Sequence, residues 1–249
     1  MKKIFLIITI TLFGMFSSFA ETDYTFVLKA LDELQNFENV DLSMIWTIVS
    51  QKPGEDKSVT KIQIFRRDSE DNALYLFLQP EVDKGQGFLM SGDNAWMYDP
   101  GSRKFSHFSL KENIGDSDAN NNDVRATSYA EDYNITSAEV GMLGKVETYI
   151  LSLEAKNNEV TTPKMKIWVR TDKNLLLKQE EYSLSDRLVR TIIIPKWTTV
   201  GGKYISAQTL IQDNLKEGEK TQMTASDISN AQIPDDVFTK AYLERINNK

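Results

Sequence analysis

Apolar positions change their spacing along the chain from that of a helix to that of strands. Between Asp23 and Glu38 they recur at helical spacing, which predicts an amphipathic helix. From Leu42 onward they alternate with polar residues, as is typical of half-buried strands. The segments predicted as strands are Leu42–Ile48, Val59–Arg67, Ala73–Gln79, Gly87–Ser91, Ala95–Asp99, Lys104–Leu110, Lys145–Ala155, Lys164–Thr171, Leu175–Leu184, Leu188–Thr198, Tyr204–Gln212 and Lys220–Ile228. Helical spacing returns after Pro234.

The spacing of these strands predicts an up-and-down antiparallel sheet that helices at the two ends of the chain cover only in part. No Pro- or Ser-rich linker interrupts the pattern, so residues 21–249 are predicted to form a single domain. Two arrangements would bury the apolar face of such a sheet. One is a barrel or sandwich that closes on itself. The other is a curved, incompletely closed sheet with an apolar cavity, which the methionine content favours.

One polar segment, Lys111–Tyr133, breaks the regularity and is too long for an ordinary hairpin loop. Residues 126–133 can form a short helix within it, and both a functional loop and simple disorder remain open. Asp116, Asp118 and Asn120 resemble the start of an EF-hand loop. The later positions of the motif carry neither the glycine nor the bidentate glutamate that calcium requires, so no metal site is predicted.

The first residues have the pattern of a secretory signal. A basic start is followed by an apolar run, Ile4–Phe16, and by small residues up to Ala20. This run is shorter than the roughly 20 residues that span a bilayer, so cleavage before Glu21 is expected. The chain contains no cysteine, which excludes disulfides and a lipid-modified N-terminal cysteine. We therefore expect a periplasmic protein without a lipid anchor.

Charge and chemistry exclude several classes of function. The formal net charge is −7, which argues against nucleic acid and anionic membrane surfaces as main partners. His107 is the only histidine and is expected to be an ordinary strand residue. Glu180 and Glu181 are expected to be solvated charges on opposite faces of a strand. With no nucleophile motif and no cofactor-binding motif, the sequence predicts a protein that is not an enzyme and uses no cofactor.

The segment Lys84–Pro100 concentrates large apolar side chains around a turn and predicts a hairpin that holds an apolar ligand. Alternation in the neighbouring strands extends this into an apolar cavity, with residues of the first helix as its lid. The predicted cavity residues are Met44, Trp46, Ile62, Ile64, Phe88, Met90, Trp96, Tyr98, Met165, Ile167, Ile192, Ile194 and Met223, and the predicted lid residues are Phe26, Leu31 and Leu34. Ordinary core packing is the alternative for each of them, because a slip of one residue would exchange the faces of a strand.

Several motifs resemble those of the outer-membrane lipoprotein-sorting, LolA-like proteins. The hairpin carries Lys84-Gly85 and, further on, the run from Asp93 to Pro100 with its Trp96 and Tyr98. The resemblance continues in the segments Ser128–Asp132, Lys166–Val169, Leu175–Lys178, Pro234–Thr239 and Tyr242–Arg245. The chain departs from the family at Asp123–Thr127, where members carry a Phe-Met-Gly-Ser-like run.

The resemblance implies an incomplete β-barrel with a helical lid and a cavity for the acyl chains of lipoproteins or phospholipids. Such a protein would be a periplasmic carrier that does no covalent chemistry. An inner-membrane exporter and an outer-membrane acceptor would then be its partners. The alternative is an accessory or sensor module of a membrane lipid exporter, which would use the same fold to bind a protein.

Overall fold

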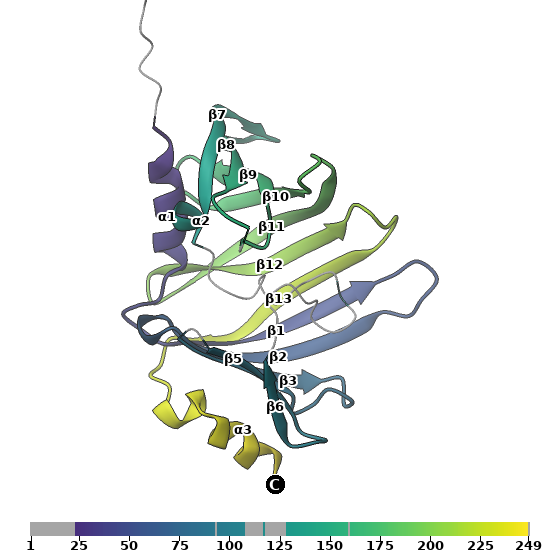
Figure 1. The fold of residues 1–249 in the computed structure, drawn as a ribbon. Helices are drawn as coiled ribbons and strands as arrows, with labels where there is room; N and C mark the ends of the chain where they lie inside the picture. Colours follow the sequence, from purple (N-terminus) through teal and green to yellow (C-terminus); the bar gives the residue numbers. More distant parts are fainter. Residues whose placement is uncertain (1–22, 93, 108–116, 118–127, 159, 249) are drawn as a thin grey trace, which may run out of the picture.

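The computed structural model describes residues 23–92, 94–107, 117, 128–158 and 160–248 (Figure 1). The expected signal, residues 1–20, lies outside the described residues, as do Asp116, Asp118 and Asn120 of the EF-hand-like run and the departing segment 123–127. No helix in the described part of the chain combines the length and apolarity needed to cross a membrane.

Antiparallel strands dominate the described structure. The strands are β1 (Leu42–Gln51), β2 (Ser58–Arg67), β3 (Asn72–Gln79), β4 (Gly87–Ser91), β5 (Asn94–Asp99), β6 (Lys104–His107), β7 (Tyr133–Leu143), β8 (Val146–Ala155), β9 (Lys164–Arg170), β10 (Leu176–Tyr182), β11 (Leu188–Val200), β12 (Lys203–Asp213) and β13 (Lys220–Ser229). The helices are α1 (Thr25–Gln35), α2 (Tyr129–Asp132) and α3 (Lys240–Asn247), with short 3₁₀ turns η1 (Asp68–Glu70) and η3 (Asp235–Phe238).

These strands form one 13-stranded sheet in the order β6-β5-β4-β3-β2-β1-β13-β12-β11-β10-β9-β8-β7. The chain makes two meanders, and β1 and β13 pair in the middle, with Ile48 opposite Met223. Because strand twist accumulates, a sheet this wide curls, and Figure 1 shows it curved and open between β6 and β7. The predicted curved, incompletely closed antiparallel sheet is confirmed. The pairing of the first strand with the last was not predicted.

The two faces of the sheet bury different clusters. On the inner face, the register places Trp46 opposite Ile62 and Ile64 opposite Tyr75, and this alternation continues around the sheet. Val27, Leu28 and Leu31 of α1 pack against the same face over β8–β11. Helices α1 and α2, here called the lid helices, lie together beside β7–β12, whereas α3 lies at the opposite end of the molecule (Figure 1). The inner face therefore has a lid over only part of its width.

The outer face of β3–β5 is covered by the C-terminal segment. Val237, Phe238 and Leu243 pack with Leu74 and Leu89 in one buried cluster. Gly85 and Gly87, two of the three glycines of the Lys84–Pro100 segment, permit this close approach. A Cβ on Gly87 would overlap the Leu243 side chain, and Gly85 has φ +87° with Asn247 donating to its carbonyl oxygen at 3.0 Å. These glycines therefore serve helix packing.

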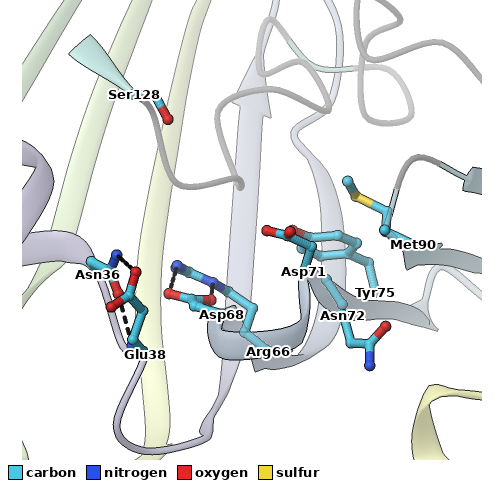
Figure 2. Close-up of a pocket in the computed structure, with 11 residues that line it drawn as sticks. Asn36, Glu38, Arg66, Asp68, Asp71, Asn72, Tyr75, Met90 and Ser128 are labelled. Carbon is cyan, nitrogen blue, oxygen red and sulfur yellow. Dashed lines mark hydrogen bonds and ion pairs between the residues drawn. The ribbon is translucent and has the colours of Figure 1, made fainter. Parts of the chain in front are cut away.

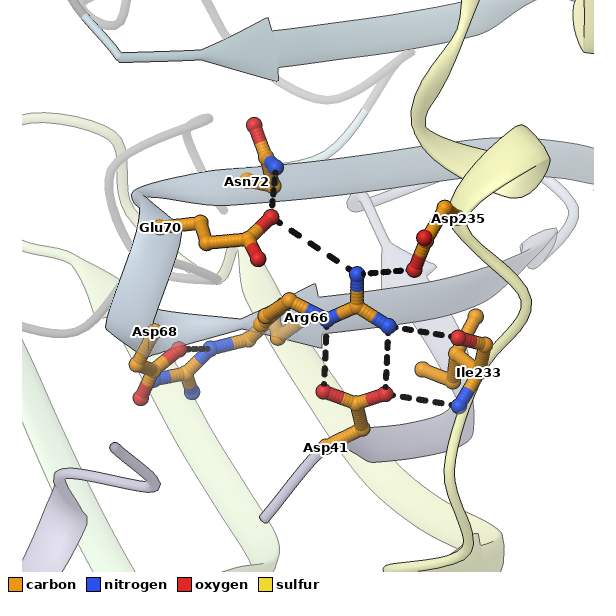
Figure 3. A network of polar contacts seen from close by, with 8 residues as sticks. Asp41, Arg66, Asp68, Glu70, Asn72, Ile233 and Asp235 are labelled. Carbon is orange, nitrogen blue, oxygen red and sulfur yellow. Dashed lines mark hydrogen bonds and ion pairs between the residues drawn. The ribbon is translucent and has the colours of Figure 1, made fainter. Parts of the chain in front are cut away.

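A buried arginine ties the C-terminal segment to the sheet, and Figure 3 labels its partners Asp41, Ile233 and Asp235. Arg67 at the end of β2 donates from Nε and Nη2 to the two oxygens of Asp41, each at 3.0 Å. The same guanidinium bonds Asp235 and the carbonyl oxygen of Ile233, and it lies 5.0 Å from the centre of the Phe238 ring. Bidentate bonds of this kind are charge-assisted and geometrically specific. Arg67 thereby joins residues that are distant in the sequence, namely Asp41 before β1 and Ile233 and Asp235 after β13.

Strand β7 lies where the spacing of apolar residues predicted no element, between residue 133 and residue 145. Its side chains are mostly exposed or half-buried because it is an edge strand of the sheet. A strand with little burial on either face does not need alternating apolar residues. The other elements lie close to their predicted bounds, and His107 is exposed at the end of β6, as expected.

Candidate functional site

A small cavity lies between the lid helices and the inner face of the sheet. Its volume is about 100 Å³. The lining comes from both lid helices and from β1, β7 and β9–β13. The lining residues are Gln35, Trp46, Tyr129, Tyr133, Thr162, Met165, Leu176, Gln179, Glu181, Ile192, Ile194, Trp197, Ser206, Thr209, Ile211 and Met223.

The structure brings most of the predicted cavity residues to the inner face. The predicted residues that line the cavity itself are Trp46, Met165, Ile192, Ile194 and Met223. The others on this face are buried in the adjoining apolar clusters, namely Met44, Ile62, Ile64, Phe88, Met90 and Ile167. These residues belong to two apolar clusters that adjoin the cavity. Whether any of them contacts a ligand remains a prediction.

The prediction that Trp96 and Tyr98 share a face with Phe88 and Met90 is wrong. The register places Trp96 opposite Leu89, so both residues point to the outer face. There Tyr98 is fully buried and the Trp96 ring lies 4.0 Å from Lys240 Nζ of α3. The turn between β4 and β5 sets this register, and the alternation of one strand cannot reveal its phase relative to the next.

The structure agrees with the prediction for only part of the set of lid residues. Leu31 is buried against the sheet as predicted, and Leu34 is half-buried. Phe26 instead is 47% exposed and packs edge-on against Tyr149 at a centroid distance of 5.6 Å. Residues 27, 28 and 31 form the inward face of α1. Phe26 precedes these residues in the sequence and lies outside the inward face, so its side chain points outward.

This placement leads to an expectation for Trp96. We expect Trp96→Ala to lower the free energy of unfolding by about 1–3 kcal/mol, because it loses packing against α3. Binding of an acyl ligand should be unchanged, since the ring lies on the outer face. Met223→Ala, which alters the cavity wall, is the matched comparison and should weaken binding. Fluorescent-lipid titration and urea unfolding measure the two effects. An equal loss of binding in both variants would contradict this placement.

Part of the cavity wall is polar, which the sequence analysis missed. Tyr129 Oη donates to Gln179 Oε1 at 3.0 Å, and Gln179 Nε2 donates to Glu181 Oε1 at 2.8 Å. Glu181 is 7% exposed and lies 3.5 Å from Arg190 Nη1. Glu181 is thus a buried ion-pair partner, and the expectation of a solvated charge is wrong for it. Burial, with the charge of Glu181 as a further cause, raises the pKa of the Tyr133 phenol.

A β-bulge explains why this polar wall was missed. The register between β9 and β10 shifts between Leu176 and Lys178. A bulge adds a residue to one strand and exchanges the faces beyond it. Leu176 and Gln179 therefore both point inward, although strict alternation would place them on opposite faces. In β11 the register shifts between Ile193 and Lys196, at Pro195, which lacks a backbone donor.

A carboxylate joins the two lid helices. Asp32 of α1 accepts hydrogen bonds from the backbone N–H groups of Tyr129 and Ala130, at 2.7 and 2.8 Å. These are the first amides of α2, which have no partner within the helix. Burial raises the pKa of Asp32, although the two N–H groups oppose the shift. The Ser128–Asp132 motif thus has a structural role, as the partner of α1.

A second hollow, of about 380 Å³, lies where the end of α1, the turn after β2 and Ser128 meet (Figure 2). Arg66 and Asp68 form a bidentate pair in its wall, and Asp68 also accepts from the Phe37 backbone N–H at 2.9 Å. Tyr75 and Met90 supply apolar surface on the opposite side in this view. The lining is otherwise mostly polar. This hollow therefore resembles a solvated rim rather than an apolar binding site.

Comparison with known proteins places the fold. A family model described as an uncharacterized protein matches residues 69–245. A crystal structure of a LolA superfamily protein from Nitrosomonas europaea aligns with a TM-score of 0.76 and 24% identity, covering 89% of this chain and 100% of that one. The chain belongs to the family of uncharacterized proteins that this family model describes, and it shares its fold with the LolA superfamily protein. No curated protein matches the sequence.

Other solved structures share the LolA-like fold. A DUF1329 family protein from Desulfovibrio piger aligns with a TM-score of 0.76 and 18% identity, covering 88% of this chain and 97% of that one. A structure described as an outer membrane lipoprotein-sorting protein domain, from Vibrio parahaemolyticus, aligns with a TM-score of 0.75 and 17% identity, covering 89% and 98%. At these identities the likeness establishes the shared fold and leaves the function to separate argument.

Proposed function

We propose that this protein, which has a LolA-like fold, is a periplasmic carrier that binds acyl chains of lipoproteins or lipids and ferries them toward the outer membrane, without covalent chemistry. The observation that carries the proposal is the apolar inner face, which consists of two buried clusters, with a cavity between it and the lid helices. An inner-membrane exporter as donor and an outer-membrane acceptor are part of the same proposal. The predicted signal segment supports the compartment.

Simple energetics explains why a protein would hold such a ligand without reacting with it. A chain of roughly 15 methylenes gains about 12 kcal/mol on leaving water, at ~0.8 kcal/mol each. A bilayer offers the same gain, so transfer between membrane and carrier is close to neutral. The carrier therefore shields the chain from water in transit, and the direction of transfer depends on its donor and acceptor.

Loading requires the lid helices to move. Binding pockets for small ligands usually measure about 300–1,000 Å³, whereas the closed cavity has about 100 Å³. The buried leucines and Val27 of α1, together with the Asp32 bonds to α2, hold the lid in place. Displacing both helices as a unit would open the apolar inner face beneath them. In this proposal the described structure is the closed form.

Native mass spectrometry of the protein purified from periplasm tests the proposal. We expect mass additions that correspond to a phospholipid or a lipoprotein. Tandem fragmentation then identifies the acyl chains. A consistently empty protein in a stoichiometric complex with another protein would contradict the carrier and favour the accessory or sensor module.

A further inference from the structure

One tryptophan in the cavity wall has an unsatisfied donor. Trp46 is 4% exposed, lines the cavity, and its Nε1 is buried with no hydrogen-bond partner among the described residues. Native proteins pair the great majority of buried donors, so an exception requires an explanation. Trp197 in the same cavity provides the contrast, because its Nε1 donates to the Leu176 carbonyl oxygen at 3.0 Å. Because Nε1 has almost no accessible surface in the closed cavity, the geometry indicates an acceptor that a ligand supplies once the lid helices move.

The composition of the wall indicates which part of a ligand the cavity holds. Gln179, Glu181 and Thr209 place polar groups beside the apolar side chains of the lining. Gln179 and Glu181 already pair within the wall, but a bare hydrocarbon chain would still leave the Trp46 donor without an acceptor, which is unfavourable. The polar end of an acylated molecule matches the wall better. With about 100 Å³, the closed cavity holds a few atoms, since a water molecule occupies roughly 30 Å³.

The negative charge of Glu181 limits which hydrogen-bond acceptor a ligand can bring into the cavity. Glu181 lines the cavity, and its partner Arg190 lies 3.5 Å away outside the lining. A carboxylate in a low-dielectric site disfavours a second anion nearby. The acceptor that reaches Trp46 should therefore be neutral. An ester carbonyl fulfils this condition, whereas the carboxylate of a free fatty acid does not.

We propose that the cavity recognises the ester end of an acyl group, with Trp46 Nε1 donating to the carbonyl oxygen and Glu181 excluding free fatty acids. This inference rests on the proposed carrier function and names the part of the cargo that the cavity reads. Ester-linked acyl chains occur in phospholipids and in the lipid groups of lipoproteins, so both remain sources of the same chemistry. The hydrocarbon chain itself would lie against the apolar clusters beside the cavity once the lid helices move.

A matched pair of ligands isolates the carbonyl group. Palmitoyl lysophosphatidylcholine and its ether-linked analogue of equal chain length differ only in that group. Isothermal titration calorimetry with the mature protein should show roughly 3- to 10-fold tighter binding of the ester, as expected for one neutral hydrogen bond. Trp46→Phe, which keeps an aromatic ring, should abolish this preference and leave binding of the ether unchanged. Trp168→Phe is the control, because Trp168 lies outside the cavity lining, and this variant should retain the preference.

A second variant tests the charge independently. Palmitate should bind the wild-type protein more weakly than the lysophospholipid ester. Glu181→Gln keeps an acceptor for Gln179 and removes the negative charge, so it should tighten palmitate binding on the order of tenfold. Binding of the zwitterionic ester should change little in the same variant. An unchanged affinity for palmitate would overturn the role assigned to Glu181.

The outcomes separate this inference from the carrier function. Equal binding of ester and ether by the wild-type protein, or a Trp46→Phe variant that keeps the preference, would overturn the inference and leave the carrier intact. Failure of every acyl ligand to bind would contradict the carrier itself. Competition between phospholipid vesicles and a diacylated lipopeptide then distinguishes the two sources. Retention of either one, together with the ester preference, supports the inference.

Discussion

We expect Arg67→Ala to reduce the free energy of unfolding by about 3–5 kcal/mol, which is the usual effect of breaking a buried ion pair from one side. Arg67 and Asp41 have side chains that are only 10% and 9% exposed. Removing the guanidinium leaves the Asp41 carboxylate buried without its cation and frees the segment at Ile233. Urea unfolding measures the change. Arg245→Ala is the matched control, because its pair with Asp236 is exposed and contributes about 0–1 kcal/mol.

The same pair gives the protein a defined pH dependence. Hydrogen bonds from Arg67 hold the pKa of Asp41 below its ordinary value of 3.8. The folded state therefore binds this proton more weakly than the unfolded chain, and the pair stabilises the fold at pH values above 3.8. That contribution is lost as the pH falls through the lowered pKa. The difference in stability between wild type and Arg67→Ala should shrink below pH 3.8; an unchanged difference would show that the charge pair is not its source.

The second large effect is expected at the lid. Leu31→Ala should reduce the free energy of unfolding by about 2–5 kcal/mol, since it leaves a gap in a closely packed cluster. Leu31 is 1% exposed and packs with Val27, Leu28 and the inner-face residues of β8 and β9. A loosened α1 should also exchange a bound acyl ligand faster. Urea unfolding and stopped-flow release of a fluorescent lipid measure the two effects.

Phe26→Ala is the matched control for the lid, because both residues belong to α1 and both were predicted to face the cavity. Phe26 is 47% exposed, so its removal should reduce the free energy of unfolding by about 1 kcal/mol or less. Ligand release should stay at the wild-type rate. A Phe26→Ala variant that released lipid as fast as Leu31→Ala would show that the outward face of α1 also controls the lid.

The strands show where local pattern was sufficient. In β1 and β2, strict alternation predicted Met44, Trp46, Ile62 and Ile64 on one face, and the structure places them there. A half-buried strand can satisfy its core only with such alternation. The same reasoning gave the helical α1 and its buried Leu31. It did not detect β7, whose position at the edge of the sheet leaves its side chains with little burial.

The candidate site depended more on contacts between distant residues. The position of Trp96 followed from the register of β4 and β5, and the inward position of Gln179 and Glu181 followed from the bulge in β10. Neither feature leaves a signal in the spacing of apolar residues. Asp32 and Tyr129 meet although they are far apart in the sequence, and only packing of α1 against α2 brings them together.

The sequence by itself determined the mainly antiparallel sheet, the amphipathic first helix and the apolar character of the inner face, because each depends on periodicity within a single segment. The tertiary structure alone decided how the strands are phased, which helix covers which face, and that part of the cavity wall is polar. These features depend on register, bulges and contacts between distant segments. A shift of one residue, which the periodicity of a single strand does not record, exchanges the two faces of a sheet.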